Sequence, residues 1–168
     1  MSGATKRNIA IAVVLLVILL VEPFWGSIKG AVSGEDGETG SSPEKVWCSV
    51  TITCADALDH MDLLSEESAR LIPDDGLLLP ETETAVEPEG TVLDALLEAA
   101  REYGIATDYS GSPAYIEGIG GLYAGDAGEV SGWTYTVNGE DALVSCAQQK
   151  VSQGDSIVWS YVCTWDES

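Results

Sequence analysis

The feature that most constrains this chain is an unbroken run of 13 apolar residues near its start, Ile9–Val21, close behind the basic pair Lys6 and Arg7. A helix that spans a bilayer needs about 20 apolar residues, so this run has the length of the apolar centre of a secretory signal. If the run extends to Trp25, that ring lies at the outer membrane interface, where indoles are favoured. In either case the basic pair stays in the cytoplasm and the rest of the chain is exported.

Two interpretations of this segment stay open. A cleaved signal peptide would use the small residues Ala31–Ser33 as its cleavage site, whereas an uncleaved segment would be an N-terminal membrane anchor. The 12 residues between the run and that site favour the anchor. We assign residues 1–33 to the signal or anchor, residues 34–44 to an acidic Gly/Ser linker, and residues 45–168 to an exported domain.

The charge of the chain excludes one class of protein. Lys and Arg total 7 against 28 Asp and Glu, a formal net charge of -21. Proteins that bind nucleic acid by neutralising phosphates present basic patches, so we predict no nucleic-acid partner and membrane contact through the N-terminal segment only. The hydrophobic fraction of 45% indicates a globular domain rather than an acidic disordered tail.

Four cysteines in an exported chain predict two disulfides. Cys48 and Cys54 lie on one predicted strand, about 20 Å apart at ~3.3 Å per residue, which is too far for them to pair with each other. We therefore expect Cys54 to pair with Cys163 and Cys48 with Cys146, which lets the first and last strands lie side by side and parallel; the opposite pairing stays open. The cysteine spacing does not match a zinc site and no loop has a calcium motif, so we predict no metal.

Hydrophobic periodicity predicts an α+β fold with a mixed sheet and one main helix. Residues 46–54 alternate as a half-buried strand, and residues 92–103 form an amphipathic helix with Thr91 as N-cap and Asp94 at the capping-box position. Helical turns are expected within 55–72, and Asn138–Gly139 is a two-residue hairpin turn. Further short strands are expected at 77–79, 105–109, 114–119, 132–137, 142–146 and 156–163. One helix supplies too few crossovers for a parallel sheet, so the sheet is antiparallel or mixed.

Several segments resemble bacterial surface proteins that carry a transcobalamin-C-terminal-like domain. The resemblance covers about residues 46–165. Its most specific part is the Ser-Gly-Trp-x-Tyr-x-Val-Asn-Gly pattern in Gly128–Gly139, followed by Gly-Asp-x-Ile-x-Trp-x-Tyr in Gly154–Tyr161. The other segments that carry it are Cys48–Met61, Leu71–Pro80, Gly90–Leu96 and Tyr115–Tyr123.

The resemblance implies a β-grasp-like fold of the soluble-ligand-binding kind, akin to the smaller domain of vitamin B12 carriers, which closes over one face of the corrin. It further implies an extracytoplasmic cobalamin- or corrinoid-binding accessory protein that passes its ligand to a membrane transporter. Under this interpretation cobalamin is a ligand and the protein holds no cofactor.

Aromatic residues beside Gly-rich turns are the candidate ligand-binding residues. Rings with nearby backbone amides suit a flat, largely apolar ligand, and we expect it to stack on Tyr123, Trp133 and Tyr135 at one end of the sheet. Asn138 is included because a loop amide can bond an amide of the ligand.

A second hypothesis is a structural or adhesive surface module that contacts protein or cell wall, which an acidic, disulfide-bonded domain on a linker fits equally well. An enzyme is the third and weakest. The single imidazole, His60, is interpreted as a solvated helix residue, and no nucleophile elbow, zinc-protease motif or phosphate loop is present. We therefore predict no catalytic residues.

Overall fold

The computed structural model describes residues 44–164. The predicted signal or anchor, residues 1–33, and nearly all of the linker lie outside the described residues, and so does the end of the chain after residue 164. Within the described part, no helix has the length and apolar character needed to cross a membrane.

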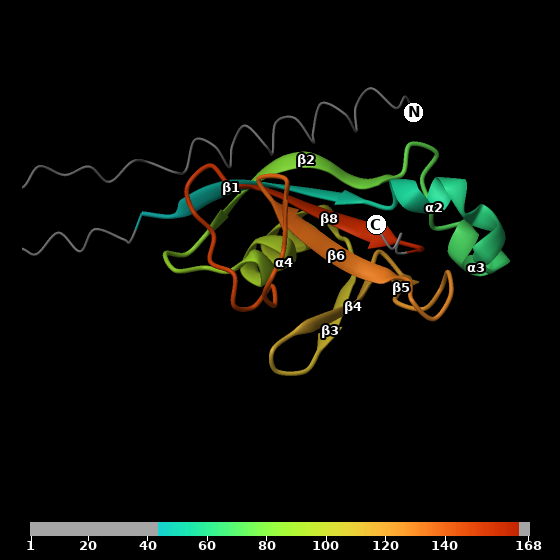
Figure 1. Ribbon diagram of the computed structural model, residues 1–168. Helices are drawn as coiled ribbons and strands as arrows, with labels where there is room; N and C mark the ends of the chain where they lie inside the picture. Colours follow the sequence, from blue (N-terminus) through green and yellow to red (C-terminus); the bar gives the residue numbers. More distant parts are fainter. Residues whose placement is uncertain (1–43, 165–168) are drawn as a thin grey trace, which may run out of the picture. The chain divides into compact units, whose positions relative to one another are not determined.

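The domain consists of a five-stranded mixed sheet, a three-stranded sheet and one long helix, so the predicted α+β class is confirmed (Figure 1). The large sheet has the order β2-β1-β8-β6-β7, and the small one the order β3-β4-β5. The elements are β1 Val46–Thr53, α2 Ala55–Asp59, η1 Met61–Leu63, α3 Glu66–Ala69, β2 Leu77–Val86, α4 Val92–Tyr103, β3 Thr107–Ser110, β4 Tyr115–Ile119, β5 Leu122–Tyr123, β6 Gly132–Val137, β7 Glu140–Asp141 and β8 Ser156–Val162.

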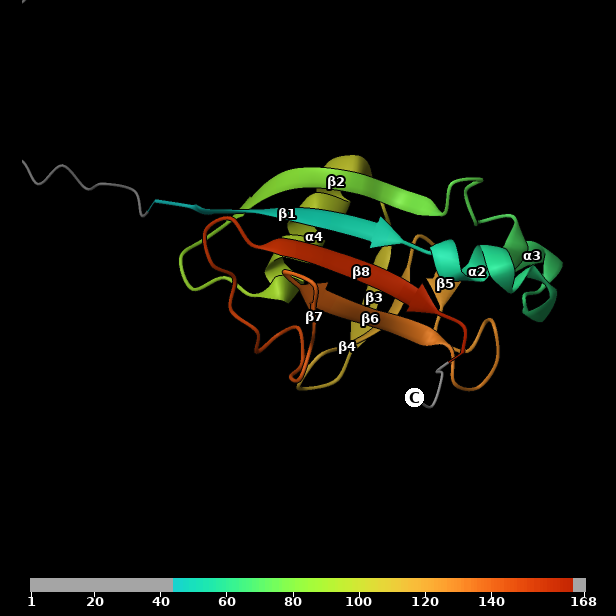
Figure 2. The ribbon, with the colours of Figure 1, turned by 45° about the horizontal axis from the view of Figure 1, so that its top comes forward.

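The first and last strands lie side by side and parallel, as the sequence predicts (Figure 2). Ser49 is opposite Ser156, and Thr53 is opposite Ser160. Every other residue of both strands is buried, in the alternation expected for a sheet with one covered face. The neighbouring strands β2 and β6 are antiparallel to this central pair.

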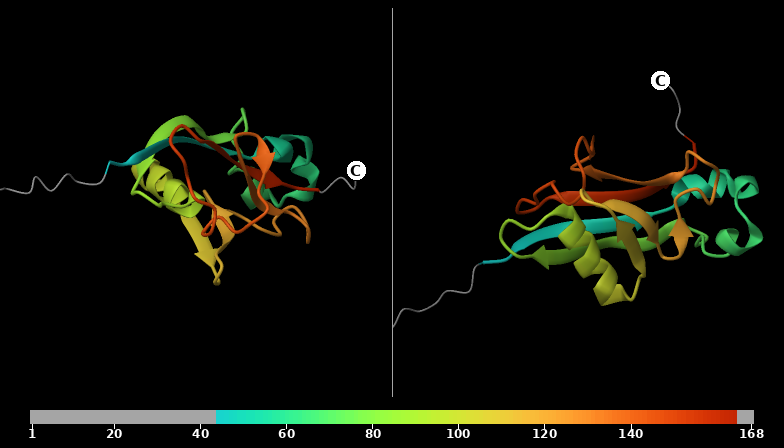
Figure 3. Two further views of the ribbon diagram at one scale, coloured as in Figure 1. Left: turned by 60° about the vertical axis from the view of Figure 1, so that its left-hand side comes forward. Right: turned by 90° about the horizontal axis from the view of Figure 1, so that it is seen from below.

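Helix α4 lies across the covered face of the large sheet, and the small sheet lies on the same side (Figure 3). The predicted cap is confirmed: the Thr91 side chain accepts from the Asp94 backbone N–H, and the Asp94 carboxylate accepts from the Thr91 backbone N–H. Gly104 ends the helix with φ 68°, a left-handed conformation that favours glycine. Burial of Val92, Leu96 and Ala99 against the sheet anchors the helix in the core.

One strand prediction is wrong, and another gives a strand that is too short. Residues 142–146 form turns instead of a strand, because the hairpin that begins at Asn138–Gly139 pairs only Glu140 and Asp141 with β6. The strand expected at 77–79 runs to Val86, and Pro80 is accommodated because β2 is an edge strand of the sheet. Turn 142–146 forms one side of the candidate site.

All four cysteines are buried free thiols in this structure. Burial, with the negative charge of Asp155 or Asp56 as a second cause, raises the pKa of Cys48 and of Cys163 to about 11. Cys163 follows β8 and its backbone N–H donates to the Asp56 carboxylate at 2.7 Å, beside the helix that follows Cys54. The expected Cys54–Cys163 and Cys48–Cys146 disulfides stay predictions.

Candidate functional site

The candidate site is a small slot between β4, β6 and the turn 142–146, with a volume of about 180 Å³. Three consecutive residues of β6, Trp133–Tyr135, form one wall, and Ala114–Ile116 form the opposite wall. Trp159, from the neighbouring strand β8, also lines it. The remaining lining residues belong to the turn: Ala142, Val144, Ser145 and Cys146.

Two aromatic pairs join β6 to β8 at this place. Trp133 is opposite Tyr161, with ring centroids 5.3 Å apart at an interplanar angle of 66°. Two residues further along, Tyr135 is opposite Trp159, with centroids 5.0 Å apart at 38°. Cross-strand aromatic pairs stabilise a sheet, so these rings belong to the core as well as to the slot.

The polar atoms of the first pair are all bonded. The Trp133 indole N–H donates to the Leu122 carbonyl at 2.9 Å. The Tyr161 hydroxyl donates to the Tyr123 carbonyl at 2.9 Å and lies 3.0 Å from the Ser131 hydroxyl. The Ala127 N–H, 3.3 Å away, donates to the same Tyr161 oxygen. The loop from β5 to β6 is thereby fastened to the sheet.

The second pair is different because one donor has no partner. The Tyr135 hydroxyl donates to the Val144 carbonyl at 2.8 Å and fixes the turn. Trp159 is only 1% exposed, yet its Nε1–H has no hydrogen-bond partner among the described residues. A buried N–H without a partner is costly and rare in native proteins, so a group from outside the described chain is expected to accept from it.

The mouth of the slot carries exposed apolar side chains. Tyr115 is 55% exposed, Val144 is also exposed, and Leu143 in the adjoining turn is 95% exposed. Leu143 lies next to a larger open pocket of about 480 Å³ on the other side of the turn, which Tyr135 and Asn138 also line. Apolar side chains at the rim of a pocket are typical of a binding surface.

Burial raises the pKa values of two side chains that line the slot. The pKa of Tyr135 is raised to about 12, mainly by burial and further by the neighbouring Cys146. Burial also raises the pKa of Cys146. No Lys, Arg, His, Asp or Glu is among the lining residues, so the slot is neutral at physiological pH.

The structure brings together only part of the predicted ligand-binding set. Trp133 and Tyr135 both line the slot, but they are only 7% and 5% exposed, which leaves little ring surface for a ligand to stack on. The Tyr123 ring packs on Gly118, where a Cβ would be 2.7 Å from the ring, and its hydroxyl donates to Asp108 at 2.7 Å. The Tyr123 ring is therefore held by its own hairpin and does not line the slot.

Asn138 has a structural role in its hairpin turn. Its φ of 54° is the left-handed conformation that this hairpin turn needs, and its side chain donates to Asp155 at 2.9 Å and accepts from the Ser156 N–H at 2.9 Å. Its amide is thus already bonded on both sides. Asn138 and Tyr135 share the larger pocket beyond the turn, so Tyr135 is the one predicted residue that borders both hollows.

Sequence reasoning placed neither Trp159 nor the turn 142–146 in the site. Trp159 follows the strict alternation of β8, which indicates a core residue and carries no sign of an unbonded N–H. The turn was predicted as a strand, and a strand there would have filled the space that the slot occupies.

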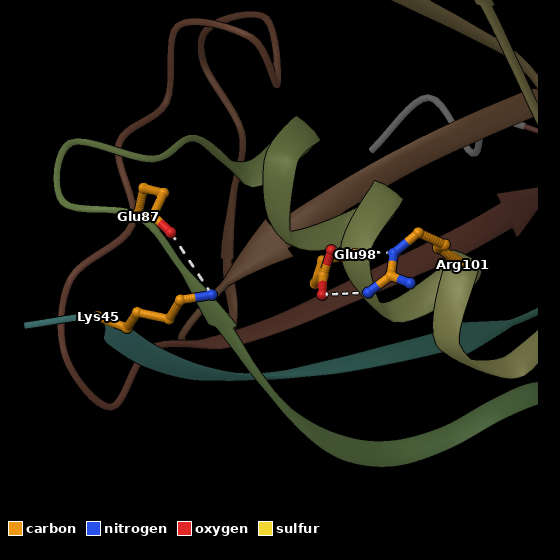
Figure 4. A network of polar contacts seen from close by, with 4 residues as sticks. All are labelled: Lys45, Glu87, Glu98 and Arg101. Atoms are coloured by element: carbon orange, nitrogen blue, oxygen red, sulfur yellow. Dashed lines mark hydrogen bonds and ion pairs between the residues drawn. The ribbon is translucent and has the colours of Figure 1, made fainter. Parts of the chain in front are cut away.

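A second open groove, of about 470 Å³, lies between β2 and α4, and its charges already bond one another (Figure 4). Lys45 Nζ lies 3.5 Å from Glu87, and Arg101 donates to Glu98 at 2.6 Å. The hydrogen bond from Arg101 lowers the pKa of Glu98. With Lys45 and Arg101 so occupied, the lining of this groove offers no unpaired cation to an anionic ligand.

The described residues contain no group of three or more His, Cys, Asp and Glu side chains placed to hold a metal ion. His60 follows α2, and its Nε2 lies 3.9 Å from the Asp56 carboxylate at a partly exposed position.

The family model of a domain of unknown function, DUF4430, matches residues 90–162. This range includes every residue that lines the slot. No curated protein matches the chain.

Two solved structures are similar to it. Haptocorrin in complex with Cbi matches with a TM-score of 0.48 and 14% identity over 71% of this chain, which spans 26% of the haptocorrin chain. A protein from Ruminococcus gnavus, named for a proposed metal-binding role, matches with a TM-score of 0.43 and 18% identity over 71% of this chain and 99% of its own. Neither likeness is close enough to transfer a ligand to this chain.

Proposed function

We propose that the exported domain is a non-catalytic ligand-binding module, and that its ligand is a planar, largely apolar molecule of the corrinoid class. The observation that carries the proposal is the aromatic slot beside β6, whose buried Trp159 N–H has no partner among the described residues. The corrinoid class comes from the resemblance of the sequence to transcobalamin-C-terminal-like domains. Delivery to a membrane transporter is part of the same proposal.

The dimensions of the slot favour a particular way of binding. Its volume of about 180 Å³ equals roughly six waters at ~30 Å³ each, below the usual range of pockets that enclose a whole ligand. A corrin ring does not fit inside. A side group of the ring enters the slot, and the ring lies over the exposed rim formed by Tyr115, Leu143 and Val144.

The test is a titration of the full chain with cobinamide and with cobalamin, followed by calorimetry and by visible absorbance. We expect saturable one-to-one binding that Tyr115→Ala weakens at least fivefold, because the exposed ring loses its contact with the corrin. Tyr103→Ala is the matched control, since Tyr103 is 53% exposed on α4 and lies outside the slot. Absence of heat and of any spectral change up to near-millimolar corrinoid would refute the proposal.

The adhesive alternative has one observation in its favour. Trp47 is half-exposed beside Ser49, Glu81 and Glu83 in a shallow hollow on β1 and β2, away from the slot. An exposed indole next to polar side chains is typical of protein-binding surfaces. If Trp47→Ala abolishes adhesion of cells that display the protein, while corrinoids do not bind it, the adhesive function replaces the ligand-binding one.

A further inference from the structure

The backbone of β6 has an open edge at the slot. In the two-residue hairpin, Val137 is paired with Glu140, and the Ala142 N–H donates to the Tyr135 carbonyl at 3.2 Å. Alternate residues of a strand direct their backbone groups to the same side, so Trp133 directs its N–H and C=O away from β8, as Tyr135 does.

Nothing in the described chain pairs with Trp133 on that side. β7 has two residues and pairs only with Thr136 and Val137, so it ends before it reaches Trp133. No residue between 44 and 164 takes the Trp133 backbone N–H or C=O on this edge. Because Trp133, Thr134 and Tyr135 line the slot in succession, the open edge borders it.

Two residues that line the slot therefore carry unpaired groups: Trp159 has its Nε1–H without a partner, and Trp133 has its backbone N–H and C=O unpaired on this edge. Two polar side chains that line the slot are already bonded within the chain. The Tyr135 hydroxyl donates to Val144, and the Ser145 hydroxyl donates to the Ala114 carbonyl at 2.8 Å. Two donors and one acceptor in a neutral, mostly apolar slot match a group that both accepts and donates.

The negative charge of the domain indicates which polar ligand groups can enter the slot. Residues 44–164 carry 22 acidic and 4 basic side chains, and none of the 4 basic ones lines the slot. A carboxylate would enter against this negative charge, without a cation to pair with and facing the Trp133 carbonyl. An ammonium group would leave both donors unsatisfied.

We propose that the slot recognises an uncharged primary carboxamide. Its oxygen accepts from the Trp159 and Trp133 N–H groups, and its NH2 donates to the Trp133 carbonyl. This inference rests on the proposed function, because it names the side group that a ligand lying on the rim inserts into the slot. It predicts that amidated ligands are preferred over the corresponding carboxylic acids.

The first test uses acetamide as the probe and needs no variant. The full chain, labelled with ¹⁵N, is titrated with acetamide up to high millimolar concentration while the indole N–H signals are followed by NMR. We expect a saturable downfield shift of the Trp159 indole proton, with little shift of the Trp133 indole proton, whose bond to Leu122 is already made. Sodium acetate at equal concentration and ionic strength is expected to leave the Trp159 signal in place.

The second test compares ligands and variants. Cobinamide, whose ring carries carboxamide side chains, is expected to bind at least tenfold more tightly than its hydrolysed polycarboxylate. Trp159→Phe removes the N–H and keeps a ring in the core, and we expect it to weaken cobinamide about tenfold. Trp47→Phe, which changes an indole outside the slot, is the control and is expected to leave affinity unchanged.

The results separate the two proposals. If acetamide shifts Trp159 and cobinamide does not bind, the carboxamide site stands and the corrinoid ligand is wrong. If cobinamide binds, but neither Trp159→Phe nor hydrolysis of the amides lowers its affinity, the ligand is right and the carboxamide site is wrong. If acetamide and acetate both leave the Trp159 signal unchanged, the slot holds water only and the inference is overturned.

Discussion

The two aromatic pairs that join β6 to β8 have the same chemistry and different surroundings. Trp133–Tyr161 and Tyr135–Trp159 each combine one indole with one phenol across the same two strands. At the first pair, every polar side-chain atom is bonded to β5 or to the loop between β5 and β6. At the second, the turn 142–146 takes the tyrosine hydroxyl but leaves the indole N–H unbonded.

The difference shows that the loops, rather than the strands, decide whether the indole of each pair has a hydrogen-bond partner. A strand with alternating apolar residues buries an aromatic pair wherever it lies in the sheet. The first loop packs down on its pair because Ala127 and Ser131 approach the Tyr161 hydroxyl. The turn 142–146 is bonded through Ser145 to Ala114, directly before β4, and the slot lies between this turn and the strands.

The largest loss of stability is expected when the Trp133–Tyr161 pair is broken. Trp133→Ala deletes a buried ring that contacts Tyr161 and bonds Leu122, so we expect the free energy of unfolding to fall by about 3–5 kcal/mol. Urea denaturation followed by far-UV circular dichroism measures it. Tyr109→Ala on β3 is the control, because its ring is exposed and we expect a change below about 1 kcal/mol. A loss below 1 kcal/mol for Trp133→Ala would show that the pair does not hold the loop.

A smaller contrast separates the two tyrosines. Tyr161→Phe removes the bonds of this hydroxyl to the Tyr123 carbonyl, to Ser131 and to the Ala127 N–H, although the Tyr123 carbonyl still accepts from the Asp126 N–H, and we expect it to cost about 1–3 kcal/mol. Tyr135→Phe breaks one partly buried bond to Val144, and we expect a cost of about 0.5–1.5 kcal/mol. Thermal unfolding of both variants at one pH gives the comparison. Equal losses would contradict the view that the first loop is fastened more strongly than the turn.

The dependence of stability on alkaline pH tests the Tyr135–Trp159 pair, because the Tyr135 hydroxyl ionises there. The pKa of Tyr135 is raised to about 12 in the folded protein, against about 10 for a tyrosine in water, so the folded state retains this proton more strongly than the unfolded state. The resulting stability is present below pH 10 and is lost as the pH rises from about 10 to 12.

Tyr135→Phe is expected to flatten that part of the curve of unfolding free energy against pH. Exposed Tyr109→Phe is the matched control and should leave the slope as it is. The buried thiols, with pKa values near 11 at Cys48, Cys54 and Cys163, add a similar loss from about pH 9 to 11 in both variants. An identical slope in wild type and Tyr135→Phe would place the Tyr135 hydroxyl in contact with water.

Much of the fold followed from the sequence because its signals are local. The capping box at Thr91 and Asp94, the alternation of β1 and the turn at Asn138–Gly139 are each set by neighbouring residues. The parallel pairing of β1 with β8 was also predicted, together with the expected pairing of Cys54 with Cys163 and of Cys48 with Cys146.

Only part of the candidate site could be predicted from the sequence. Trp133 and Tyr135 could be found because their pattern beside a Gly-rich turn is visible in the sequence. Trp159 could not, since an unbonded N–H depends on a turn that packs from elsewhere in the chain. Tyr123 looked free between its glycines, but its hydroxyl bonds Asp108, which is 15 residues away.

The smallest expected effect concerns two cysteines, one beside each aromatic pair. Cys146 lines the slot at the Tyr135–Trp159 end, whereas Cys163 follows β8 just beyond Tyr161. In reduced, folded protein at pH 8, we expect iodoacetamide to label Cys146 a few times faster than Cys163. Burial raises the pKa of both thiols, so the expected difference comes from access: Cys146 lines the slot, whereas Cys163 is buried and does not line it. Peptide mass spectrometry measures both rates, and labelling in urea, where the two should react alike, supplies the reference. If Cys163 is labelled faster, the region beside the Trp133–Tyr161 pair opens to the reagent more readily than the slot does. That result would contradict the contrast between the two pairs.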